Sequence, residues 1–139
     1  MDLDINIMHL LCGKLLTFSI LAGIQNNRID FDKAQVVVSV AADFLGSWVA
    51  GEEHTQDYIK NRDHKSLKGG KMSRHIQFES GLSMTGSNAD ARVAIKPSEE
   101  GAVLISLYNE ITGQSVSGGT NNAKAKKVIT LAAKELVAA

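Results

Sequence analysis

The hydrophobic pattern of this chain changes its period once, and that change limits the folds it can adopt. From Asp32 to Ala50 the apolar residues recur with the period of an amphipathic helix. Beyond residue 75 they stand in short runs separated by glycine, proline and asparagine, which is typical of strands and turns. Helical and strand patterns that are segregated along a chain predict an α+β fold.

The first half of the chain is predicted to be an N-terminal αα-hairpin. Leu3 to Gln25 is so densely apolar that a helix there would be covered on most sides. A short turn joins it to a second predicted helix, Asp32 to Ala50, so the two should pack antiparallel. The four valines between Val36 and Val40 favour a strand, because β-branching restricts χ1 in helices, but the periodicity favours a helix. In so small a domain a second copy of the chain is the simplest cover for the first helix, which predicts a homo-oligomer.

The second half is predicted to form an antiparallel sheet of three to five strands, followed by a C-terminal helix from Asn122 to Val137. Short loops separate the strand patterns, and short loops join antiparallel neighbours. In the first predicted strand, Ile76 and Phe78 would face one side and the polar residues the other; in the third, Val93 and Ile95 would point inward. The predicted strands are Arg74–Ser80, Leu82–Thr85, Ala91–Lys96, Ala102–Asn109 and Ile111–Ser117.

Length and composition predict one domain in a reducing compartment. The 139 residues, 44% of them hydrophobic, suit a single core. We divide residues 1–139 into a helical half (1–60), a basic connector (61–74), and a sheet with the C-terminal helix (75–139). The lone Cys12 cannot form an internal disulfide. No Lys or Arg precedes Lys14, unlike in a secretory signal, so we expect a cytoplasmic protein with no membrane partner.

Residues 60–75, the basic segment, contain six Lys or Arg and one acid, although the whole chain has no net charge. Clustered like charge favours an anionic partner. Lys65, Lys68, Lys71 and Arg74 recur every third residue around Gly69-Gly70, whose backbone amides are suited to hold a phosphate between the cations. The alternative is a solvated connector between the two halves.

A second candidate anion site precedes the last predicted helix. Ser117, Gly118, Gly119 and Thr120 supply flexible backbone and hydroxyl groups, and Lys124 adds a cation near the helix N-terminus, where anions bind. The alternative is ordinary capping by Thr120 or Asn121. If the two basic regions converge, in one subunit or between two, they form a pocket for a phosphorylated ligand.

No catalytic residue, metal site or cofactor is predicted, because the chain lacks GxGxxG, GxSxG and helix-borne metal-ligand spacings. The preferred interpretation is a small non-enzymatic protein that binds an anionic ligand, such as a nucleotide. One alternative is an adaptor or inhibitor that docks on an acidic or nucleic-acid-bearing partner through the basic segment. Another is a hydrolase or transferase that uses His64 and His75. Nucleic acid is a second choice as partner, since only seven aromatic residues are present for base stacking.

Overall fold

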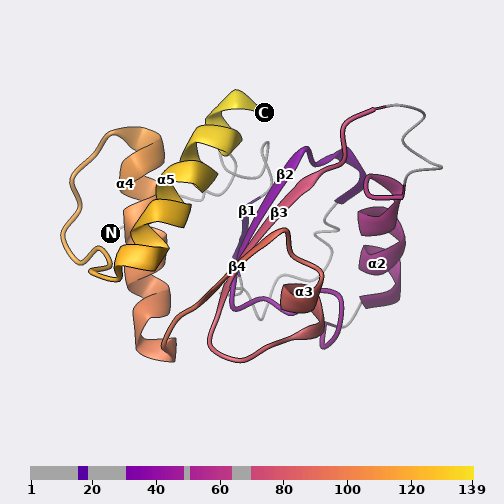
Figure 1. Ribbon diagram of the computed structural model, residues 1–139, viewed down its shortest axis with the longest axis horizontal. Coiled ribbons are helices and arrows are strands. Elements are labelled where there is room, and N and C mark those ends of the chain that lie inside the picture. Colours follow the sequence, from indigo (N-terminus) through magenta and orange to yellow (C-terminus); the bar gives the residue numbers. More distant parts are fainter. Residues whose placement is uncertain (1–15, 19–30, 49–50, 64–69) are drawn as a thin grey trace, which may run out of the picture.

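The computed structural model describes residues 16–18, 31–48, 51–63 and 70–139, and a parallel sheet forms its centre (Figure 1). The strands lie in chain order across the sheet, and each runs parallel to its neighbour. The predicted antiparallel sheet is therefore wrong. The strands are β1 (Leu16–Phe18), β2 (Val36–Val40), β3 (Arg74–Glu79) and β4 (Ala91–Ala94).

Helices cover both faces of this sheet. In Figure 1, α4 and α5 lie to the left of the sheet, while α2 and the short α3 lie to the right. The crossover from β2 to β3 contains α2 and the crossover from β3 to β4 contains α3, whereas α4 and α5 follow β4 and cover the other face. The helices are α2 (Gly51–Lys60), α3 (Met84–Ser87), α4 (Glu100–Thr112) and α5 (Ala123–Ala138), with 3-10 turns η1 (Phe31–Lys33) and η2 (Pro97–Glu99).

The predicted αα-hairpin is not observed. Its second helix, Asp32 to Ala50, is replaced by part of η1, the strand β2 and a turn. All five residues of β2 are buried, since both faces of the strand are covered, and the β-branched valines suit this position. Of its first helix, Leu3 to Gln25, only β1 is described, and it is a strand. The predicted oligomer interface otherwise lies outside the described residues, as does Cys12.

Two predicted strands are helices instead. The segment Leu82 to Thr85 contributes to α3, which Ser83 caps by accepting from the Gly86 amide. The apolar run Ala102 to Asn109 lies within α4, where Val103 and Leu107, four residues apart, face the core. Gly113 ends α4 in the left-handed conformation, with φ of 71°, that favours glycine at a helix end. The predicted strand Ile111–Ser117 is therefore the end of α4 and the loop that follows.

The strand β3 separates two cores, and its predicted alternation is confirmed. Ile76 and Phe78 are fully buried against α4 and α5, in the larger core that also holds Val93 and Ile95. The other face meets a smaller aromatic core in which the rings of Phe31 and Phe44 stack with centroids 4.4 Å apart. The polar residues His75, Gln77 and Glu79 lie on this side of β3 and are buried, whereas Arg74 lies on the side of α5.

The predicted C-terminal helix is confirmed as α5. Its apolar stripe is buried against the sheet through Ala125, Ile129, Ala132, Ala133 and Leu136, and its lysines lie on the exposed side. Among the helices of the described residues, none combines the length and the apolar character needed to cross a membrane.

Candidate functional site

Three cations of the basic segment are paired with carboxylates of the protein itself. The Lys60 ammonium lies 2.7 Å from Asp57 on the same helix. The Arg62 guanidinium binds Asp90 at 2.8 Å, and Arg74 lies 3.5 Å from Glu135 of α5. Gly70 and Lys71 are exposed, whereas Lys65, Lys68, Gly69 and His64 lie outside the described residues. The net positive charge of the segment is thus reduced by acids outside it, two of which are distant in sequence.

The pair of Arg62 and Asp90 is a structural link. Two guanidinium nitrogens of Arg62 donate to the two oxygens of Asp90, at 2.8 and 2.9 Å. Asp90 also accepts from the backbone N–H of His75 at 2.7 Å. Burial alone would raise the pKa of Asp90, but the hydrogen bonds from Arg62 and from that amide outweigh it and lower the pKa. Arg62 therefore links the start of β4 to the end of α2. Its positive charge is paired with the carboxylate of Asp90.

Among the described residues of the two predicted halves of the anion site, Arg74 and Lys124 lie far apart. Arg74 pairs with Glu135 in the last turns of α5, whereas Lys124 lies in its first turn. Eleven residues of α-helix separate the two positions, roughly 16 Å along the axis. Of the predicted site residues, Ser117, Gly118, Gly119, Thr120 and Lys124 stay together in one loop and one helix turn.

The loop before α5 is held mainly by its own hydrogen bonds. Asn122, and not Thr120 or Asn121, caps α5, since its side-chain oxygen accepts from the Lys124 and Ala125 amides. The buried Thr120 donates its amide to Ser106 Oγ at 2.8 Å, and its hydroxyl accepts from the Asn122 amide at 3.2 Å. Two of these four N–H groups, those of Lys124 and Ala125, are therefore used in capping; the alternative interpretation predicted capping here, but by Thr120 or Asn121 and not by Asn122.

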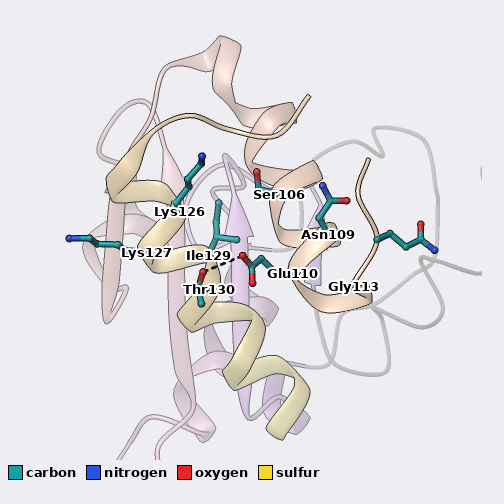
Figure 2. A pocket seen from close by; sticks show the side chains of 9 residues that line it. Ser106, Asn109, Glu110, Gly113, Lys126, Lys127, Ile129 and Thr130 are labelled. Carbon is teal, nitrogen blue, oxygen red and sulfur yellow. Dashed lines mark hydrogen bonds between the residues drawn. The ribbon is translucent and has the colours of Figure 1, made fainter. Parts of the chain in front are cut away.

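The same loop borders a hollow of about 710 Å³ between α4 and α5 (Figure 2). Ser106 connects the two features, because it accepts from Thr120 and also lines the hollow. A Cβ on Gly119 would lie 2.7 Å from Ser106 Oγ, so glycine allows the loop to approach α4 closely. The lining residues are Ser106, Asn109, Glu110, Gly113, Gln114, Lys126, Lys127, Ile129 and Thr130.

The polar side chains of the hollow come from two helix faces. Ser106, Asn109, Glu110 and Gly113 are spaced as one face of α4, and Lys126 and Thr130 are one turn apart on α5. Figure 2 shows Lys126 extending on the side of Ser106, while Lys127 extends outward from the other labelled residues. Lys124 is exposed and does not line the hollow.

Hydrogen bonds fix one rim of the hollow. The Asn109 side chain both donates to and accepts from the backbone of Val116, at 2.8 and 2.9 Å. The Tyr108 hydroxyl donates to the side-chain oxygen of Gln114 at 2.9 Å, so the amide nitrogen of Gln114 is the end suited to meet a ligand. Buried Ile129 supplies an apolar floor. The hollow therefore combines cations, hydroxyls and an amide donor around an apolar base.

His75 belongs to a buried polar row formed by Tyr58 of α2 and the polar face of β3. The row runs from Tyr58 through His75 and Gln77 to Glu79. The Tyr58 hydroxyl lies 2.9 Å from His75 Nδ1, and His75 Nε2 lies 3.3 Å from Gln77 Oε1. Burial lowers the pKa of His75 to about 4, despite the hydrogen bond with Gln77. A neutral and fully buried histidine cannot reach a substrate.

Glu79 completes this row at the carboxyl end of the sheet. Its carboxylate accepts from Gln77 at 3.2 Å, from the Ser83 hydroxyl at 2.6 Å and from Arg92 Nε. Burial alone would raise the pKa of Glu79, but the hydrogen bonds from Arg92 and Ser83 outweigh it and lower the pKa. Because its carboxylate is engaged by these three side chains, Glu79 is a structural acid.

The sequence interpretation missed Ser106, Asn109 and Glu110, because it placed them in or beside a predicted strand. Their helical spacing is the signal that would have grouped them on one face. Within the described residues, no group of three or more His, Cys, Asp or Glu side chains is placed to hold a metal ion.

No protein-family model matches this chain, and no curated protein matches it in sequence.

Proposed function

We propose that this protein binds a small phosphate-bearing ligand, such as a nucleotide or a sugar phosphate, in the hollow between α4 and α5. The observation that carries the proposal is the position of Lys126 and the Ser106 hydroxyl on the same side of a hollow of about 710 Å³, whose lining also includes Lys127. Lysine is a common phosphate ligand and acts as a point charge. The volume is within the range of small-molecule sites, which is roughly 300–1,000 Å³.

The proposed site includes the second of the two anion sites predicted from the sequence, the loop before α5. The loop Ser117 to Thr120 adjoins the hollow through Ser106, and its exposed Gly118 and Gly119 place backbone beside the proposed phosphate position. The basic segment is not included, because three of its cations are paired with the protein's own acids. The predicted cytoplasmic location would supply nucleotides and sugar phosphates as ligands.

Replacing Lys126 with glutamine is expected to raise the dissociation constant for the bound phosphate compound about tenfold, the effect of losing one charge-assisted contact. A thermal-shift screen of nucleotides and sugar phosphates first identifies compounds that raise the melting temperature of the wild-type protein, since ligand binding to the native state does so. Calorimetric titration of the best compound then compares Lys126→Gln with the wild type.

Lys134→Gln is the matched control, because Lys134 is also exposed on α5 but does not line the hollow. It removes the same charge from the same helix and is expected to change the affinity less than twofold at physiological salt, where distant surface charges are screened. Equal losses in the two variants would refute the site. A screen in which no phosphate compound shifts the melting temperature would refute the proposed function itself.

A further inference from the structure

The hollow contains a carboxylate, and this restricts the kind of anion that it can accept. Glu110 lines the hollow together with Lys126 and Lys127, and within the described part of the chain no ion pair joins it to either lysine. Two like charges about 4 Å apart repel each other by about 1 kcal/mol in water and about 4 kcal/mol near a protein surface. Bare phosphate is therefore a poor occupant of the space beside Glu110.

The cationic and the acidic parts of the hollow are separated by one helical turn. Ser106 and Glu110 are four residues apart on α4, and Lys126 and Thr130 are four apart on α5, which is roughly 6 Å along each helix. Thr130 Oγ1 donates to Glu110 Oε1 at 3.4 Å, so the second residue of one pair contacts the second residue of the other. Figure 2 shows Lys126 and Ser106 on one side of this hydrogen bond. A ligand that fits both parts has a phosphate at one end and hydrogen-bond donors one turn away.

Glu110 retains acceptor capacity for such donors. An ionised carboxylate has about four lone-pair positions, and Thr130 uses one of them. A pair of neighbouring hydroxyl groups is the matching donor, and acidic residues accept from ribose hydroxyls in this way at dinucleotide sites. Ribose phosphates place these hydroxyls on the ring, away from the phosphate.

We infer that the ligand of the hollow carries a vicinal diol at a distance from its phosphate, as ribose phosphates do, and that the Glu110 carboxylate accepts from that diol while Lys126 and the Ser106 hydroxyl hold the phosphate. This inference rests on the proposed phosphate site and specifies its ligand class. Glu110 thereby selects ribose phosphates against inorganic phosphate and against sugar phosphates that lack the diol.

The test compares adenosine monophosphate, its dideoxy analogue, which lacks both ribose hydroxyls, and orthophosphate, each titrated calorimetrically into the wild type and into Glu110→Gln. In the wild type, adenosine monophosphate should bind at least tenfold more tightly than the dideoxy analogue, the ratio expected from a charge-assisted hydrogen bond. In Glu110→Gln this ratio should fall below threefold, while orthophosphate should bind more tightly than in the wild type. The gain for orthophosphate is a result that misfolding would not produce.

Glu53→Gln is the control, because Glu53 is exposed on α2, across the sheet from the hollow, and its removal changes the net charge equally. It should leave the ratio unchanged. Equal binding of adenosine monophosphate and the dideoxy analogue by the wild type, with Lys126 still required, would overturn the diol inference and leave the phosphate site standing. Absence of binding by all three compounds would overturn both.

Discussion

Replacing Gly86 with alanine is expected to lower the free energy of unfolding by about 3 kcal/mol. A Cβ on Gly86 would overlap the carboxylate of Glu79, which packs directly against this glycine. The carboxylate cannot move aside freely, because Gln77, Ser83 and Arg92 all donate to it. Either the clash remains or buried hydrogen bonds are lost. Urea unfolding followed by circular dichroism measures the difference.

Gly101→Ala is the control for this substitution. Gly101 lies near the start of α4, and a Cβ there meets nothing within 4 Å. Alanine is the better helix former, so this variant should be more stable than the wild type by up to about 1 kcal/mol. If Gly86→Ala is as stable as Gly101→Ala, then the carboxylate of Glu79 is not held where the hydrogen bonds indicate.

One physical cause explains both kinds of error in the sequence analysis: a strand that was predicted as a helix and a helix that was predicted as a strand. A strand that is covered on both faces has no polar side, so four of the five residues Val36–Val40 are valine and the segment, which we predicted to be helical, lacks the alternation of a half-buried strand. A short apolar run of this kind fits a buried helix equally well. The helical segment Ala102 to Asn109 shows the converse. Only Val103 and Leu107 of this segment are buried in the core, but other apolar residues lie around the helix outside that stripe. Where one face did alternate, at Ile76 and Phe78, the prediction was confirmed.

The polar residues of β3 show why alternation does not reveal burial. His75, Gln77 and Glu79 form the polar face that sequence analysis assigns to the opposite side from the core, yet all three are buried. They are tolerated there because they bond to one another and to residues from other elements. Such partners are invisible in a local pattern, since they arise only when the sheet is assembled.

The candidate site was predictable in part. The loop Ser117 to Thr120 was identified because glycine and hydroxyl residues before a helix are a local signal. The hollow beside it depends on two helices that were not predicted to pack together, so Glu110 and Lys126 were missed. In the basic segment, the local pattern did not reveal the partners of two cations. The charge of the segment was counted over sixteen consecutive residues, whereas the acids that pair with Arg62 and Arg74 lie at positions 90 and 135.

Lowering the pH from about 6.5 to about 4 is expected to destabilise the protein through His75. An unfolded histidine takes up a proton near pH 6.5, whereas burial delays protonation of folded His75 to about pH 4. Between these values the unfolded state binds more protons, so stability falls as the pH falls. The difference of about 2.5 pKa units corresponds to a loss of about 3 kcal/mol. Urea unfolding at intervals across this pH range measures it.

Two variants separate His75 from the acids around it. His75→Gln removes the titrating group, so its stability, although lower at neutral pH, should decline little between pH 6.5 and 4.5. Tyr58→Phe removes the hydroxyl 2.9 Å from His75 but leaves the imidazole buried, so the decline should persist. Glu79 and Asp90, whose pKa values are lowered in the folded state, lose their contribution only as the pH falls further, through those lowered values. A decline that is equally steep in His75→Gln would therefore assign the acid sensitivity to another group and contradict the buried neutral state of His75.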